Sequence, residues 1–265
     1  PYFINPAGTN NLNEHSIEQY SSILMDNANL AHANLMNDHI ENHNSCSQLK
    51  EMIQKENMRE ITTPQTICVE NGAFSNCTSL IYITVSSFVR SIKNMAFYKC
   101  TSLQRIDIPL SVTEIGNDVF SCCSSLQQIQ LPSSIRSIGD RAFYNCRSIL
   151  KIKIPSSVVS IGGRAFSNCS SLTKIEVPSS VTSIGNRAFS YCRSLKQIVV
   201  SSALTEISNA LFYQCESLDK IVLPLSINLI GKRAFNGCKS LKSILFIAPE
   251  ESLDNNEYSA YISLT

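Results

Sequence analysis

Cysteine is the residue type that could most readily carry chemistry in this chain of 265 residues, which contains 11 of them. Thiolates act as nucleophiles and as metal ligands. A metal site requires ligands that converge on one point, whereas a constant spacing of 23 residues distributes eight of these thiols along a line. We therefore interpret the row as small apolar side chains inside a repeated fold, free rather than disulfide-bonded. The row comprises Cys77, Cys100, Cys123, Cys146, Cys169, Cys192, Cys215 and Cys238.

Histidine does not supply the partner that cysteine or serine catalysis would need. All four histidines precede residue 46, at His15, His32, His39 and His43. The repeated cysteines therefore have no general base nearby in the sequence. His39 and His43 lie four residues apart, but no H-E-x-x-H pattern and no third ligand accompanies them. Because the chain also lacks a P-loop and a G-x-G-x-x-G motif, the sequence predicts no enzyme, no metal and no cofactor.

The cysteine row belongs to a repeat of 23 residues that continues through eight units without an insertion. Each cysteine follows a phenylalanine by three residues and precedes an isoleucine by six. In the unit 178–200, the spacing of Leu195, Ile198 and Val200 predicts a strand with its apolar side chains turned inward. One unit cannot bury its own apolar face, so neighbouring units must stack, with parallel strands about 4.8 Å apart.

The other half of the unit predicts a second extended piece and a helical turn. Val181 and Ile184 mark the short extended piece. Gly185 is expected to permit a turn with positive φ. Asn186 would then cap one helical turn over residues 187–192, and six of the eight units carry Asn or Asp at this position. We therefore predict one short helical turn per repeat.

The repeated units resemble the BspA-like class of leucine-rich repeats, most clearly at residues 131–152 and 154–175. The resemblance implies a repeat solenoid, a right-handed superhelix with a parallel β-sheet on its concave side. It also implies a cell-surface or secreted protein of a host-associated microbe that binds host proteins or cells. Free cysteines and the lack of a visible signal peptide favour a cytoplasmic location instead, and this alternative stays open.

Three parts are expected along the chain. Residues 1–62 form a helical N-terminal flank, and residues 247–265 form a C-terminal cap or tail. The eight repeats between them occupy residues 63–85, 86–108, 109–131, 132–154, 155–177, 178–200, 201–223 and 224–246.

Both flanks are expected to cover the ends of the stack. Capping boxes that begin at Ser16 and Ser45 predict a helical hairpin, with Leu49 and Ile53 on the apolar face of its second helix. We expect this hairpin to cap the first repeat; a dimerising helix or the end of an upstream domain is the alternative. Residues expected to close the other end are Leu253, Tyr258 and Tyr261.

Charge is distributed unevenly, although the net charge is only +1. Residues 63–246 hold 19 Lys and Arg against 9 Asp and Glu, whereas residues 1–62 and 247–265 are acidic. Either the acidic ends dock on the basic middle, or the middle presents a basic binding face. No run of 18 apolar residues occurs, so we expect no transmembrane helix.

Ligand recognition is expected at the strand positions that vary from unit to unit and point outward. These positions contain a basic strip in the middle repeats. They also contain an apolar row in the last three, which the tail, a partner protein or a second copy would cover. The candidate residues are Tyr82, Arg105, Gln128, Lys151, Lys153, Lys174, Glu176, Val199, Lys220, Val222 and Leu245. Arginines also recur at one turn position, at Arg141, Arg164, Arg187 and Arg233.

Taken together, these features predict a non-catalytic protein-binding and adhesion module that uses its concave sheet. The expected partner is a host extracellular-matrix or cell-surface protein or an acidic glycan, and a homodimer is compatible with the pattern. The alternative is an intracellular scaffold for protein–protein interaction. Nucleic acid is not expected, because the outward rows lack interleaved aromatic residues.

Overall fold

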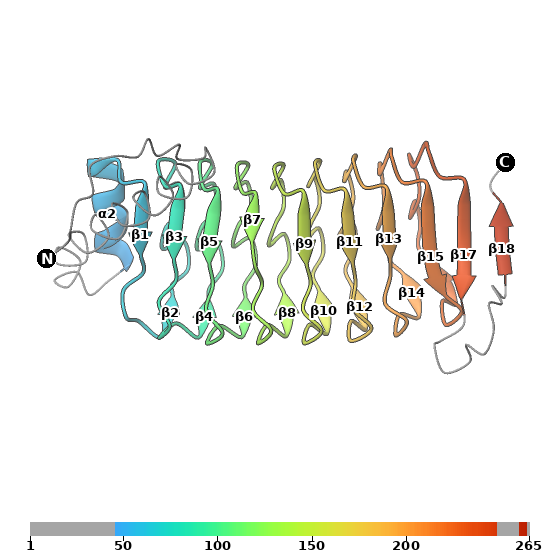
Figure 1. Ribbon diagram of the computed structural model, residues 1–265, viewed down its shortest axis with the longest axis horizontal. Helices are drawn as coiled ribbons and strands as arrows, with labels where there is room; N and C mark the ends of the chain where they lie inside the picture. The colour runs from blue at the N-terminus through green and yellow to red at the C-terminus, as the bar shows by residue number, and fades with distance from the viewer. Residues whose placement is uncertain (1–45, 248–259, 264–265) are drawn as a thin grey trace, which may run out of the picture. The chain divides into compact units, whose positions relative to one another are not determined.

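The computed structural model describes residues 46–247 and 260–263. These residues form a β-solenoid of parallel strands in which each repeat makes one turn (Figure 1). Helix α2 (Cys46–Glu56) lies at the N-terminal end of the stack. The predicted repeat solenoid with a helical N-terminal flank is therefore confirmed.

The longer strand of each turn forms one side of the solenoid, and we call its solvent-facing surface the strand face. Pairing is parallel and in register, so that Ile175 lies beside Ile152 and Ile198 of the adjacent turns. The ladder is interrupted once, between residues 129 and 151, which divides this side into two sheets. The strands are β1 (Glu60–Thr62), β3 (Tyr82–Thr84), β5 (Arg105–Asp107), β7 (Gln128–Ile129), β9 (Lys151–Lys153), β11 (Lys174–Glu176), β13 (Gln197–Val199), β15 (Lys220–Pro224) and β17 (Ser243–Ile247).

A second side of the solenoid consists of strands of two residues, which confirms the predicted second extended piece. In each of these strands before the last, the second residue is buried, as at Ile161 and Ile184. In the last strand the corresponding Ile230 is exposed. The strands are β2 (Cys68–Val69), β4 (Ser91–Ile92), β6 (Glu114–Ile115), β8 (Ser137–Ile138), β10 (Ser160–Ile161), β12 (Ser183–Ile184), β14 (Glu206–Ile207) and β16 (Leu229–Ile230).

Stacked rows of phenylalanine and cysteine fill the core beneath the third side, which is built of turns. Phenylalanine rings of successive units stack with centroids 5.2–5.9 Å apart. From Cys100 onward, each thiol of the row donates to the phenylalanine carbonyl of the preceding unit, as from Cys146 to Phe120 at 3.0 Å. All cysteines in the described part of the chain are free. The prediction of buried, unpaired thiols is confirmed, except that Cys238 in the last turn is half-buried.

The predicted helical turn is wrong, because two residues in this part of each unit adopt the left-handed region. In one unit these are Arg187 and Tyr191, both with φ of 60°. A right-handed helix cannot pass through them. Gly185, which we expected to hold the positive φ, is not among the residues that do. Glycine is needed there for close approach, because a Cβ would lie 2.4 Å from the backbone nitrogen of Gly163.

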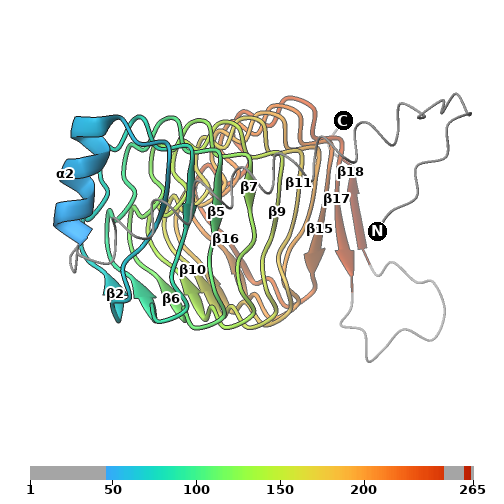
Figure 2. The ribbon, with the colours of Figure 1, turned by 60° about the vertical axis from the view of Figure 1, so that its left-hand side comes forward.

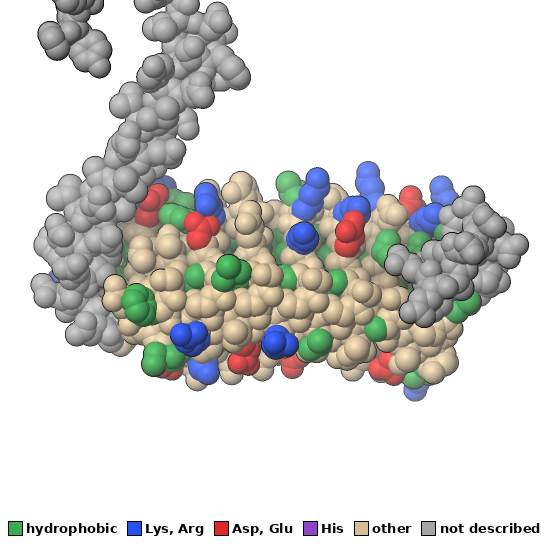
Figure 3. Space-filling view, turned by 60° about the horizontal axis from the view of Figure 1, so that its bottom comes forward, with side chains coloured by type: hydrophobic (Ala, Val, Ile, Leu, Met, Phe, Trp, Pro, Cys, Tyr) green, Lys and Arg blue, Asp and Glu red, His purple; other side chains and the backbone are tan. Residues whose placement is uncertain are grey.

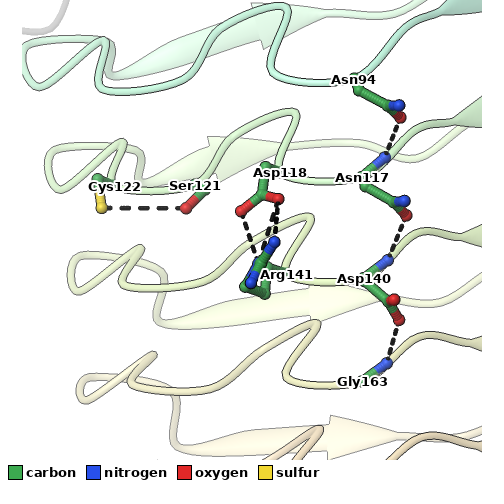
Figure 4. Close-up of polar contacts among 8 residues, drawn as sticks. All are labelled: Asn94, Asn117, Asp118, Ser121, Cys122, Asp140, Arg141 and Gly163. Carbon is green, nitrogen blue, oxygen red and sulfur yellow. Dashed lines mark hydrogen bonds and ion pairs between the residues drawn. The ribbon is translucent and has the colours of Figure 1, made fainter.

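The repeated Asn does not cap a helix within its own unit, as we had expected, but bonds to the next unit. Asn186 Oδ1 accepts the backbone N–H of Asn209 at 3.0 Å, and Asn209 Oδ1 accepts that of Lys232 at 2.7 Å. Figure 4 shows the same contact in earlier turns. A serine row acts similarly at another corner, where the Ser157 hydroxyl donates to the carbonyl of Ile135 at 2.6 Å. Polar side chains therefore connect adjacent turns.

Helix α2 covers the first turn of the solenoid (Figure 2). Leu49 and Ile53 are fully buried, as the predicted second helix of the flank requires. Lys50 Nζ donates to the carbonyl of Gly72 at 3.2 Å and to Ser75 Oγ at 2.9 Å. Strand β1 pairs with β3, so the sheet begins at residue 60 rather than at the expected start of the repeats. The first helix of the predicted hairpin lies outside the described residues.

The C-terminal end of the strand side is extended by one more strand. Strand β18 (Ala260–Ser263) pairs antiparallel with β17, and Tyr261 lies opposite Leu245 (Figure 2). The chain therefore returns to the edge of the last repeat, as predicted for Tyr261. Leu253 and Tyr258, the other residues of that prediction, lie outside the described residues.

Candidate functional site

Strand register aligns the candidate residues in two rows along the strand face. The first row joins Tyr82 to Arg105 and Gln128. After the interruption of the sheet it continues through Lys151, Lys174, Gln197, Lys220 and Ser243. The second row continues in the same way through Lys153, Glu176, Val199, Val222 and Leu245. The strand spacing used for the prediction thus brings all eleven candidates to one side of the solenoid, with different exposure to solvent.

A cluster of polar contacts holds the side chains of Tyr82 and Arg105 in place. Tyr82 Oη donates to Asp107 Oδ2 at 2.5 Å and accepts from the Thr84 hydroxyl at 3.0 Å. The Arg105 guanidinium bonds both carboxylate oxygens of Asp107 and lies 5.3 Å from the centroid of the Tyr82 ring. Partial burial and the hydrogen bond to Asp107 raise the pKa of Tyr82. Because Asp107 neutralises Arg105, this part of the face is preorganised and carries little net charge.

The basic strip lies on the middle strands and is partly neutralised. Lys174 pairs with Glu176 at 2.6 Å, and this contact lowers the pKa of Glu176. Lys151, Lys153 and Lys220 form no ion pair within the described residues. Figure 3 shows basic side chains protruding along the upper margin of the molecule, with acidic ones among them. The predicted strip consisted of Lys151, Lys153, Lys174 and Lys220, and three of these lysines have no ion-pair partner among the described residues.

The apolar row at the C-terminal end is aligned as predicted, but its exposure decreases along the chain. Val199 is 39% exposed, Val222 is half-buried and Leu245 is only 7% exposed. Leu245 belongs to the strand that β18 joins, whereas Val199 lies two strands away. The exposed apolar surface is therefore confined to Val199 and part of Val222, and we no longer regard Leu245 as available to a ligand.

The recurring arginines lie on the turn side and line a shallow groove with Asp140, Gly163 and Asn186. Arg141 differs from the other three because its guanidinium bonds both carboxylate oxygens of Asp118, at 2.9–3.1 Å (Figure 4). Asp118 is buried, and this contact raises the pKa of Arg141. The repeat spacing indicated the arginines, but nothing in it indicated Asp118 as a partner, because that residue occupies the arginine position of the preceding unit.

Thiol chemistry is suppressed by the fold. Burial raises the pKa of Cys146, Cys192 and Cys215 well above the ordinary thiol value, and it raises that of Cys238 to about 11. These thiols are therefore protonated at neutral pH, and those of Cys146, Cys192 and Cys215 are also buried. Within residues 46–247, no three His, Cys, Asp or Glu side chains gather as a metal site would require. The same part of the chain has no helix long and apolar enough to cross a membrane.

Comparison with known proteins agrees with the repeat solenoid described above. The family model described as "BspA type Leucine rich repeat region" matches residues 49–172 and 137–265, with six copies. A T. pallidum leucine-rich repeat protein of known crystal structure is 27% identical, with a TM-score of 0.50 over 70% of this chain and 78% of its own. A leucine-rich repeat protein from Eubacterium ventriosum is 24% identical, with a TM-score of 0.50 over 74% of this chain and 62% of its own. No protein of curated function matches the sequence.

Proposed function

Since the chain belongs to the BspA-type leucine-rich-repeat family, we propose that it is a non-catalytic binding module that recognises a protein partner through the strand face. The observation that carries this proposal is the contrast between the two sides of each strand. The inward residues repeat almost unchanged and are buried, whereas the outward residues change from turn to turn. A rigid frame that presents variable side chains is suited to recognition rather than to catalysis.

The chemistry of the face favours a partner with an acidic and partly apolar surface. Lys151, Lys153 and Lys220 supply positive charge without an ion-pair partner among the described residues, and Val199 supplies exposed apolar area on the same face. The Tyr82 ring and the Arg105 guanidinium lie together at the other end, and both residue types are enriched where binding energy concentrates in interfaces. We propose a host extracellular-matrix or cell-surface protein as this partner, with an acidic glycan as the next most compatible ligand. This host role rests on the family and not on the geometry.

Charge reversal tests the proposal. The triple variant Lys151→Glu/Lys153→Glu/Lys220→Glu should bind immobilised extracellular-matrix proteins and host cells about tenfold more weakly or worse, because repulsion replaces attraction across the contact. The matched control is Arg90→Glu/Lys93→Glu/Arg136→Glu, which makes the same change in charge away from the strand face. Equal binding by both variants, with unchanged melting temperatures, would contradict the proposal.

An intracellular scaffold is the second candidate function, and one observation favours it. All described cysteines are free, including the half-exposed Cys68 and Cys122, which is typical of a reducing compartment. We propose the cell surface as the location on the basis of the family. Antibody labelling of intact cells, before and after permeabilisation, separates the two. Labelling only after permeabilisation would support the scaffold and contradict the surface role.

A further inference from the structure

The asparagine ladder on the turn side has a gap at Gly163. In the turns before it, Asn94, Asn117 and Asp140 each accept the backbone N–H of the next unit, at 2.6–2.8 Å. Figure 4 shows this series ending at Gly163, which has no side chain to continue it. The backbone N–H of Asn186, one turn further, consequently has no hydrogen-bond partner among the described residues. One acceptor position of the ladder is thus vacant.

Packing does not require glycine at this position. A Cβ on Gly163 would lie 3.4 Å from the Asn186 carbonyl oxygen and 3.5 Å from Asp140 Oδ1, which are ordinary contact distances. At the preceding residue, Gly162, a Cβ would lie 2.5 Å from the backbone nitrogen of Asp140. Gly163 also has no positive φ. The vacant position is therefore an open recess that a side chain could fill but does not.

Positive charge surrounds the recess. Arg164 and Arg187 belong to the two turns on either side of it, and Lys232 and Arg233 extend the same groove. These four side chains form no ion pair within the described part of the chain. The Asp140 carboxylate also lines the groove, but it already accepts the N–H of Gly163 at 2.6 Å. An incoming oxygen would therefore meet one amide without a described acceptor, in a groove that the Arg164 and Arg187 side chains line and that the Asp140 carboxylate makes less positive.

We propose that the groove binds a sulfated glycan chain, with one sulfate oxygen in the recess at Gly163. The Asn186 amide would donate to this oxygen, as amides elsewhere in the ladder donate to an Asn or Asp side chain. The Arg164 and Arg187 guanidinium groups bind the remaining oxygens, since their planar donors fit oxyanions. From Arg141 to Arg233 the groove spans four turns, about 20 Å, which suits an extended polymer with several sulfates.

Two features favour this ligand over other polyanions. None of the described residues that line the groove is aromatic, so a base would have no ring to stack on, which disfavours single-stranded nucleic acid. The four arginines recur at one position of the turn with the same backbone conformation, with φ of 54–60°, and they line one groove that crosses successive turns. The site lies on a different side of the solenoid from the strand face and goes beyond the proposed function.

Closing the recess tests the proposal, with heparin as the probe. Gly163→Asn should complete the ladder by accepting the Asn186 amide, and it leaves the net charge unchanged. We expect the affinity for heparin to fall about tenfold, because a charge-assisted hydrogen bond is lost, while the melting temperature stays the same or rises. Gly163→Ala is the matched control, since it adds a Cβ without an acceptor and should have a smaller effect. Equal heparin binding by Gly163→Asn and the native chain would contradict the proposal that a sulfate oxygen occupies the recess.

Further arms separate this site from the strand face and from nonspecific attraction. Arg164→Gln/Arg187→Gln should weaken heparin binding by more than about tenfold, because two oxyanion contacts disappear. The strand-face variant Lys151→Glu/Lys153→Glu/Lys220→Glu should keep most of it. Desulfated heparin should not compete with heparin for binding to the protein. Loss of binding in the strand-face variant alone, or equal competition by desulfated heparin or DNA, would contradict the assignment.

Discussion

In this solenoid, the burial and backbone conformation of a residue depend on its position within the turn more than on the intrinsic preference of its residue type. The cysteine row illustrates this, since the thiols from Cys100 to Cys215 are buried and each donates to a backbone carbonyl of the preceding turn. The constant spacing allowed the burial to be predicted, but the acceptor could not be, because it depends on how adjacent turns are offset. The left-handed residues were missed for a related reason. Arg187 and Tyr191 are not residue types that favour positive φ, and in this conformation their backbone amides donate to carbonyls of the next turn.

Alkaline pH should destabilise the protein through its buried thiols. Burial raises the folded-state pKa of Cys192 far above the unfolded value of about 9. The stabilising contribution is therefore complete below pH 9 and is lost as pH rises above it, because only the unfolded chain releases the proton. Above pH 9, each buried thiol of this kind lowers the free energy of unfolding by about 1.4 kcal/mol per pH unit. Urea unfolding between pH 9 and 10.5 should show that the free energy of unfolding of Cys192→Ala falls less steeply with pH than that of the native chain, by about this amount. Identical slopes would contradict the burial of the thiol.

Relief of a left-handed residue should stabilise the protein. Met95 has φ of 57° and an exposed side chain. Met95→Gly should raise the free energy of unfolding by about 0.5–1 kcal/mol, because glycine adopts this conformation without a Cβ clash but loses more chain entropy. Its neighbour Ala96, buried and with ordinary φ, is the control, and Ala96→Gly should destabilise by about 1 kcal/mol, because a buried methyl group is lost and glycine loses more chain entropy. Denaturant unfolding measures both; a less stable Met95→Gly protein would refute the conformational argument.

At the scale of elements, sequence reasoning located the strands well and the connections poorly. Alternating apolar residues predicted both extended segments of each repeat, because burial on one side requires that pattern. The pattern Gly-Asn-Arg-Ala-Phe also satisfied the rules for a capped helical turn, although the Arg187 and Phe189 amides bond to carbonyls of the next unit instead. Strand β1 was placed in the flank, since Glu60, Ile61 and Thr62 show too little of the repeat to identify it.

The last two strands provide the test at this scale. Leu245→Lys should lower the free energy of unfolding by about 2 kcal/mol or more, because a buried apolar side chain would be replaced by a charge. Val199→Lys, at the equivalent position two turns earlier, should change stability by less than about 0.5 kcal/mol, because Val199 is exposed. Thermal or urea unfolding of the pair provides the comparison. Equal effects would mean that β18 does not protect the edge.

At the scale of the whole molecule, the strand face and the turn side present different charged side chains on one repeated backbone. The basic middle of the sequence includes Lys151, Lys153 and Lys220 on the strand face and Arg164, Arg187 and Arg233 on the turn side. Periodicity could predict both rows, because every position recurs on one side of the stack. It could not predict which charges are free, since pairs such as Arg141 with Asp118 depend on particular substitutions in adjacent turns.

Lysine footprinting tests the central claim most directly, because it asks which face a partner covers. The protein, free and bound to host-cell membranes, is acetylated briefly and the modified lysines are quantified by mass spectrometry. Recognition through the strand face predicts that Lys151, Lys153 and Lys220 are protected on binding, whereas Lys93 and Lys239, which lie away from that face, react equally in both states. Protection of Lys93 and Lys239 with unchanged reactivity of the strand-face lysines would contradict the account.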